Sequence, residues 1–84
     1  MEKEEIGKVV KFFPRPNAAV VELTGGLKVG DRVWIKGVTT EFEQEVTSLQ
    51  TEGQPITEAK AGEVIGVEVK ERVRPNDIVY KVVE

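Results

Sequence analysis

The chain has 84 residues, enough for one hydrophobic core but too few for two independent ones. It contains no cysteine and no histidine, which excludes disulfides, thiol nucleophiles, imidazole bases and the usual zinc sites. The 15 acidic and 12 basic residues give a net charge of −3, which argues against binding nucleic acid through overall positive charge. We therefore predict one domain over residues 1–84 that is not an enzyme and has no catalytic, cofactor-binding or metal-binding residues.

The sequence carries no targeting or membrane signal that we can identify. Its first residues, Met1–Glu5, are mostly charged and lack the apolar run of a signal peptide. No stretch approaches the ~18 consecutive apolar residues that cross a bilayer. Together with the absence of cysteine, these features lead us to expect a cytoplasmic protein without a membrane partner.

Six strand-sized segments contain most of the apolar residues. Each is rich in β-branched or aromatic residues and is bounded by turn-forming residues, the pattern of short strands joined by turns. The segments are Ile6–Phe13, Ala18–Leu23, Arg32–Lys36, Thr40–Val46, Val64–Val69 and Ile78–Val83. Residues 56–60 are interpreted as a loop with at most one helical turn. Closing six short strands into a barrel would hide their edges, so we predict an all-β, six-stranded β-barrel.

Alternation within these segments predicts which side chains form the core. Inward positions alternate with outward ones along a strand that has one buried face. Phe12 and Phe13 are adjacent, so only one can point inward; we expect the other to lie under the loop 14–16, the alternative being contact with a partner. The predicted core consists of Val9 or Val10, Val21, Leu23, Val33, Ile35, Val46, Leu49, Val67, Val79 and Val82 or Val83.

The segment Gly25–Val33, with the sequence GGLKVGDRV, resembles the second domain of translational GTPases. The phrases VTSLQ (Val46–Gln50) and EAKAGEVIGV (Glu58–Val67) follow in the order and spacing of that domain, which is a six-stranded Greek-key barrel. The resemblance implies a Greek-key barrel like translation elongation factor domain 2 over nearly the whole chain. The phosphate-binding loop of the GTPases is absent.

The chain resembles one branch still more closely, the C-terminal domain of the U32 peptidase family. The residues that carry this resemblance are Phe13–Pro14, Ala19–Leu23, Ile35–Gln44 and Val69–Arg74. In that family the barrel is an appendage to a larger domain, which holds the chemistry and the family's cysteines and which this sequence does not contain. The resemblance therefore implies a non-catalytic accessory module.

The segment Arg32–Lys36 offers the first candidate binding surface. Alternation places Arg32, Trp34 and Lys36 on its outward face. An aromatic side chain between two cations can stack a base and neutralise phosphates, or it can anchor a protein partner. The alternative is that Trp34 is half-buried beneath a neighbouring loop, with the two cations extended around it.

A second candidate is the basic series Lys70, Arg72 and Arg74, in which alternation would place three cations on one strand face. Such a row could contact a phosphate backbone or an acidic partner. The alternative is cross-strand pairing with a row of outward glutamates that has the same spacing and the opposite charge. That row consists of Glu41, Glu43 and Glu45, and we interpret it as solvated surface and not as a metal site.

The leading functional hypothesis is a binding module without a small-molecule substrate or cofactor. Its partner would be a protein, either a U32-type catalytic domain or a translation component, or RNA. The alternative is a separately encoded or excised part of a U32-type peptidase or RNA-hydroxylating enzyme that contributes no chemistry itself. Partner binding is expected on the face of Arg32, Trp34 and Lys36 in preference to the glutamate row, because tryptophan is a frequent interface hot spot.

Overall fold

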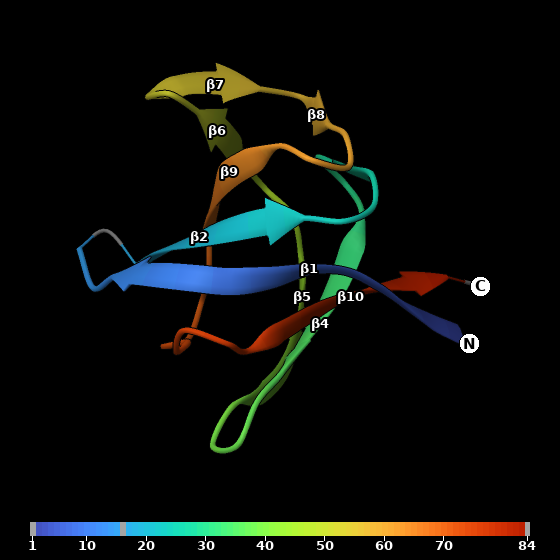
Figure 1. Ribbon diagram of the computed structural model, residues 1–84, viewed down its shortest axis with the longest axis vertical. Coiled ribbons are helices and arrows are strands. Elements are labelled where there is room, and N and C mark those ends of the chain that lie inside the picture. Colours follow the sequence, from blue (N-terminus) through green and yellow to red (C-terminus); the bar gives the residue numbers. More distant parts are fainter. Residues whose placement is uncertain (1, 16, 84) are drawn as a thin grey trace.

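The fold consists only of strands and connecting segments (Figure 1). The computed structural model describes residues 2–15 and 17–83, which contain ten β-strands and no helix. The strands are β1 (Glu2–Phe13), β2 (Ala18–Leu23), β3 (Leu27–Lys28), β4 (Arg32–Lys36), β5 (Glu41–Glu45), β6 (Leu49–Thr51), β7 (Gln54–Ile56), β8 (Glu58–Ala59), β9 (Val64–Glu68) and β10 (Ile78–Val83). All six predicted segments are strands (β1, β2, β4, β5, β9 and β10), so the all-β prediction is confirmed. Residues 56–60, expected to form a loop, contribute instead to β7 and β8.

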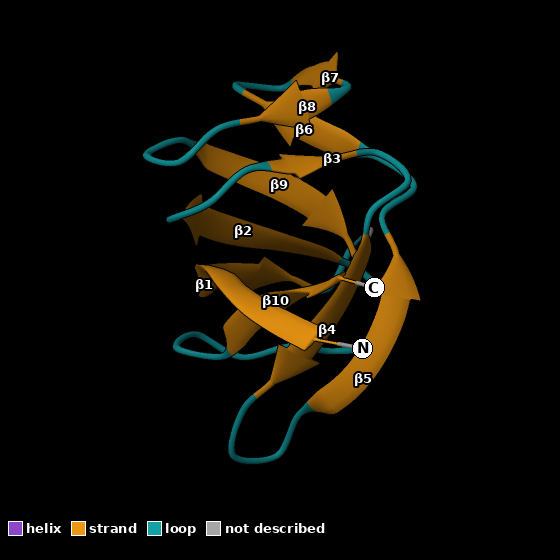
Figure 2. Ribbon diagram, turned by 90° about the vertical axis from the view of Figure 1, so that its right-hand side faces the viewer, coloured by secondary structure: helices purple, strands orange, loops and turns teal. Residues whose placement is uncertain are grey.

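Eight strands form one antiparallel sheet in the order β5-β4-β10-β1-β2-β9-β6-β7, and β3 pairs with β8 in a small second sheet. Within the large sheet, the order β10-β1-β2-β9 places the last strand beside the first, as in a Greek key, although β3 to β8 come between β2 and β9 in the sequence. The segment between β9 and β10 makes this return. Figure 2 shows that the large sheet is strongly curled, so that one face of each long strand is turned towards a shared interior.

The two ends of the six-strand order β5-β4-β10-β1-β2-β9 meet at a seam that one side chain bridges. Nε2 of Gln44, on β5, donates a hydrogen bond to the carbonyl oxygen of Glu68 at 2.8 Å. Oε1 of Gln44 accepts a hydrogen bond from the amide of Lys70, also at 2.8 Å. In the described part of the chain, the backbone ladder itself stays open between β5 and β9. The six long strands therefore curl around one interior as a barrel would, but their backbone ladder is not closed, and a side-chain amide joins the last pair.

The buried side chains form one cluster inside the curled sheet. It contains Val9 and not Val10, together with all eight positions predicted without an alternative: Val21, Leu23, Val33, Ile35, Val46, Leu49, Val67 and Val79. The expectation for the end of β10 is wrong, because Val82 is only partly buried and Val83 is exposed. Pairing of β10 with β4 ends at Lys81, so the last two valines pair only with the start of β1 and lie past the core.

A bulge in β1 determines which of the two adjacent phenylalanines faces the core. The pairing of β1 with β2 shifts by one residue between Val9 and Lys11. Such a shift reverses the inward and outward phase of the strand beyond it. As a result Phe12 packs against the core, whereas Phe13 points outward and is 43% exposed. The expectation that a loop covers the second phenylalanine is wrong.

Three turns between strands share one construction. They span Lys28–Asp31, Lys60–Glu63 and Arg74–Asp77, and in each the last amide donates to the first carbonyl oxygen. In each, the carboxylate of the last residue also accepts a hydrogen bond from the first amide, at 3.0, 2.7 and 2.9 Å respectively. The third residue has a positive φ, which glycine and asparagine tolerate: Gly30 (98°), Gly62 (93°) and Asn76 (78°). The carboxylates therefore help to fix the conformation of these turns.

Candidate functional site

The outward face of β4 contains the first predicted site, and its two cations are already paired. Nε of Arg32 lies 2.9 Å from Oε2 of Glu43, and Nζ of Lys36 lies 3.2 Å from Oε1 of Glu41. Both glutamates project from β5, which pairs with β4 in antiparallel register. Any phosphate or acidic partner would have to compete with these carboxylates for the two cations.

Trp34 is half-buried, as one of the two interpretations of the sequence proposed. The residues that cover Trp34 belong to neighbouring strands and not to the loop that was expected. The ring of Tyr80, directly opposite on β10, lies 5.1 Å from the Trp34 ring at an angle of 42°. Nζ of Lys3, on β1, lies 4.6 Å from the centre of the Trp34 ring. The aromatic side chain is therefore held between residues of neighbouring strands, and only part of its surface is available to a partner.

The basic series Lys70, Arg72 and Arg74 does not lie on a strand, because β9 ends at Glu68. The segment that follows is instead bound across the end of the sheet. The amide of Val69 donates to the carbonyl oxygen of Asn17 (2.9 Å), and Val9 exchanges hydrogen bonds with the carbonyl of Asp77 and the amide of Asn76. The buried side chain of Val73 anchors its middle. The prediction of one flat row of cations is therefore wrong.

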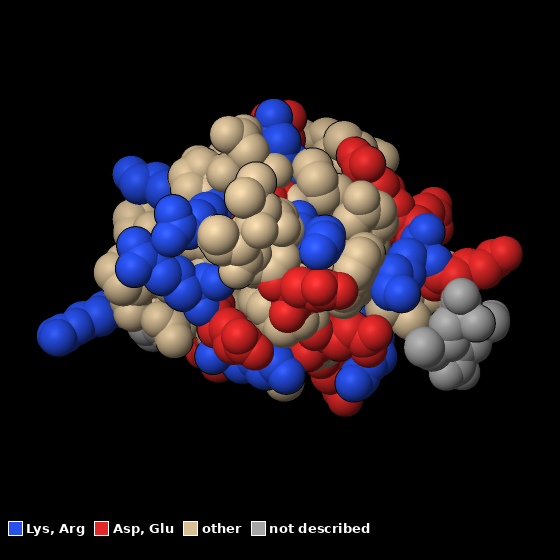
Figure 3. Space-filling view, turned by 90° about the horizontal axis from the view of Figure 1, so that it is seen from below, with Lys and Arg blue, Asp and Glu red and all other residues tan. Residues whose placement is uncertain are grey.

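The side chains of this basic series are nevertheless exposed. Among the described residues, none of Lys70, Arg72 and Arg74 has a carboxylate within 4.0 Å. The interpretation that they pair with the glutamate row is wrong, because Arg32 and Lys36 occupy that position. Figure 3 shows lysine and arginine side chains gathered at one end of the molecule, with acidic side chains towards the middle. Only this end is predominantly basic, because elsewhere on the same face lysine and arginine side chains lie among the acidic ones (Figure 3).

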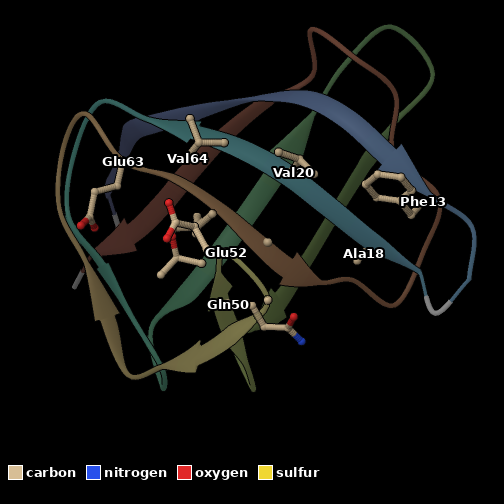
Figure 4. A pocket seen from close by; sticks show the side chains of 11 residues that line it. Phe13, Ala18, Val20, Gln50, Glu52, Glu63 and Val64 are labelled. Atoms are coloured by element: carbon tan, nitrogen blue, oxygen red, sulfur yellow. The ribbon is translucent and has the colours of Figure 1, made fainter.

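A feature that sequence reasoning missed is an open pocket of about 610 Å³ on the outer face of β2 and β9 (Figure 4). Its apolar walls include Phe13 and Val64, which are 43% and 50% exposed. The remaining lining residues are Ala18, Val20, Gln50, Thr51, Glu52, Gly53, Glu63, Ile65 and Gly66. Gly66 was interpreted as marking a bend or a close backbone contact, but the nearest atoms to a Cβ built there are those of Gln50 at 3.9 Å. The signal in the sequence was the glycine itself.

Within residues 2–15 and 17–83, no group of three or more acidic, histidine or cysteine side chains is arranged to hold a metal ion. In the same residues, no helix is long and apolar enough to cross a membrane.

The fold is that of a small all-β domain found in U32 peptidases. The C-terminal domain of a putative U32 peptidase from Geobacillus thermoleovorans has a TM-score of 0.89 to this chain at 23% identity, covering 95% of this chain and 93% of that one. Its selenomethionine variant gives a TM-score of 0.86 at 23% identity and covers 90% of this chain and 96% of that one. No family model matches the sequence.

Two curated relatives that match the sequence are named as a protease and a collagenase. An uncharacterised protease of Methanocaldococcus jannaschii is 42% identical over 79 residues, and a collagenase of Porphyromonas gingivalis is 38% identical over 82 residues. These matches cover 93% and 95% of this chain but only 19% and 23% of the two relatives. The predicted resemblance to the C-terminal domain of the U32 peptidase family is thus confirmed. The likeness to translation elongation factor domain 2 stays a prediction.

Proposed function

We propose that the chain is a non-catalytic accessory module that docks on the larger part of a U32-type protease. The observation that carries this proposal is the extent of the matches, which span nearly all of this chain and about a fifth of each protease. The remaining four fifths of such a protein would supply the chemistry. The chain itself has no histidine or cysteine from which an ordinary nucleophile and base could be assembled.

The predicted docking face on β4 supports the proposal only in part. Arg32 and Lys36 are engaged by glutamates, so their contribution to partner binding would be small in water. Trp34 would contribute through the part of its ring that Tyr80 and Lys3 leave uncovered. We therefore assign this face a secondary role in docking. We also propose that the protein is cytoplasmic.

The experiment replaces the matching segment of the P. gingivalis collagenase with this chain. Collagen hydrolysis is measured for the unmodified enzyme, for a variant lacking the segment, for the chimera and for this chain alone. We expect the chimera to retain hydrolysis, the deletion variant to lose most of it, and the isolated chain to have none. Hydrolysis by the isolated chain would refute the non-catalytic role, and an inactive but folded chimera would refute the accessory role.

RNA is a second candidate partner, favoured by the three exposed cations Lys70, Arg72 and Arg74, none of which pairs with a carboxylate in the described part of the chain. The test is fluorescence anisotropy with a single-stranded RNA of about 12 nucleotides at increasing salt. Each phosphate contact removed by an Arg72→Ala or Arg74→Ala substitution should lower the salt slope by about 0.7. Arg32→Ala is the matched control, since Arg32 is already paired with Glu43. Equal slopes for all three variants and the original chain would exclude RNA binding by this segment.

A further inference from the structure

The pocket on β2 and β9 is hollow because one strand position has no side chain. Gly66 pairs with Val20 on one side and with Gln50 on the other, so it lies at the centre of the outer face. It does not have the positive φ that requires glycine, and a Cβ would meet nothing closer than 3.9 Å. Glycine within a strand is less favourable than alanine, because its backbone loses more conformational freedom on folding. The backbone conformation at this position does not require glycine, but the hollow exists only because position 66 has no side chain.

Exposed apolar side chains flank the hollow. Phe13 stands at one end and Val64 at the other, with Val20 between them, as Figure 4 shows. The side chains of Phe13 and Val64 are each about half exposed. Exposed apolar side chains on a small domain normally occur singly, so two of them beside one pocket are unusual. The bulge in β1 turns Phe13 outward, towards this pocket. The lining therefore forms a largely apolar groove that no side chain among residues 2–15 and 17–83 fills.

The two ends of the groove differ in charge. Glu52 and Glu63 lie at the Val64 end (Figure 4), and one carboxylate oxygen of Glu63 is engaged by the amide of Lys60. At the other end, Nζ of Lys11 lies 5.0 Å from the centre of the Phe13 ring. Glu68, which pairs with Ala18, is also exposed on the outward face of β9 at this end, so the Phe13 end carries both signs of charge. The Val64 end is anionic and is complementary to a basic residue of a partner segment.

We propose that this groove binds an extended protein segment that places one apolar side chain over Gly66. A basic residue of the segment faces Glu52 and Glu63. The inference rests on the proposed role as a protein-docking module and adds the surface and the chemistry of the partner. Phe13 and Val64 contact this apolar side chain from the two ends of the groove. The hollow therefore favours segments that contain an apolar residue, and the charges favour one direction of the bound segment.

The experiment titrates the full chain with short capped peptides and follows backbone amide resonances by NMR. The peptides contain lysine, a central leucine and aspartate in either order, and the controls replace leucine with serine or both charged residues with aspartate. We expect one order to bind best and to shift the amides of Val20, Val64 and Gly66. Binding of the serine peptide with equal affinity, shifts confined to other strands, or no binding by any peptide would overturn the proposal.

Substitutions distinguish specific binding in the groove from non-specific binding to the surface. Phe13→Ala removes one wall and Gly66→Val fills the hollow, and each should weaken the best peptide at least tenfold. Glu52→Gln should weaken it about threefold and reduce the preference for one charge order. Val38→Ala is the control, because Val38 is fully exposed in the loop between β4 and β5. Unchanged affinity of both Phe13→Ala and Gly66→Val, with both variants folded, would refute the groove as the binding site.

Failure of this proposal differs from failure of the proposed function. If the collagenase chimera is active and remains so with Phe13→Ala and Gly66→Val, the chain is an accessory module that docks elsewhere, and the groove proposal is wrong. If the folded chimera is inactive while the peptides still bind the groove, the accessory role in proteases is wrong and the groove serves another protein. Displacement of the peptides by RNA at the same amides would overturn the assignment of a protein partner.

Discussion

Removing the side-chain amide of Gln44 should loosen the seam at which β5 meets the end of β9. Gln44 forms two hydrogen bonds there, one to the Glu68 carbonyl and one from the Lys70 amide, both 2.8 Å long. The Gln44→Ala variant leaves both backbone groups without their protein partner. Gln44→Glu keeps an acceptor for the Lys70 amide but places a carboxylate oxygen against the Glu68 carbonyl, so it loses the donor.

The expected loss can be estimated from these two bonds. A hydrogen bond contributes about 0.5–1.5 kcal/mol net to stability, and these two lie near solvent, where water replaces part of each. Gln44→Ala should therefore lower the free energy of unfolding by about 1–2 kcal/mol. In a domain of this size, each kcal/mol corresponds to a fall in melting temperature of about 4–8 °C.

Urea denaturation monitored by tryptophan fluorescence measures this loss, with Gln54→Ala as the matched control on the exposed strand β7. Amide hydrogen exchange at Lys70 gives a local readout, and its exchange should accelerate in Gln44→Ala. The reasoning is refuted if Gln44→Ala and Gln54→Ala have the same urea midpoint, or if protection at Lys70 is unchanged. In that case the seam is maintained by packing of the neighbouring strands and not by the amide.

Three further changes test other parts of the fold. Gly37→Ala should cost about 1–3 kcal/mol, because a Cβ there would overlap the buried Asp77 carboxylate, and an unchanged melting temperature would contradict this. Asn76→Ala should cost about 1–2 kcal/mol because φ is 78°, whereas Asn76→Gly should melt close to the original chain. A double-mutant cycle on Arg32 and Glu43, whose side chains are 55% and 31% exposed, should give a coupling energy below about 1 kcal/mol; a larger value would show that this surface pair is not solvent-screened.

The positions of the long strands could be predicted because the evidence for them is local. Each strand is bounded by residues that prefer turns, and the carboxylate-stabilised turn at Arg74–Asp77 lies where proline, asparagine and aspartate follow one another. Alternation then identified the core, since a strand with one buried face repeats every two residues. On β2 and β4 every predicted core residue is buried, but the predicted core omitted Phe42 on β5 and Ile65 on β9, which are also buried.

Predictions that depended on the phase of a strand near its end were less successful. The bulge after Val9 reverses the phase of β1, and no residue type marks it in the sequence, so the exposure of Phe13 was missed. The basic series was assigned to a strand because its charges alternate. In the structure the buried residues there are Val69 and Val73, four positions apart, and hydrogen bonds to β1 and the adjoining turn determine the path of the segment.

The candidate surfaces also differ in how far the sequence could reveal them. Arg32, Trp34 and Lys36 attract attention because they are the side chains that usually bind partners. On this curled sheet, however, glutamates of β5 pair with the two cations, and residues of β10 and β1 cover part of Trp34. A cation or an aromatic ring in such a sheet is therefore weak evidence of a binding site by itself. Gly66 has the opposite property, because its surroundings leave room for a side chain and its backbone does not require a glycine. The space above Gly66 lies between the exposed apolar side chains of Phe13 and Val64, and only a side chain from another molecule could fill it. The groove is therefore a stronger candidate than the outward face of β4 for contact with another protein.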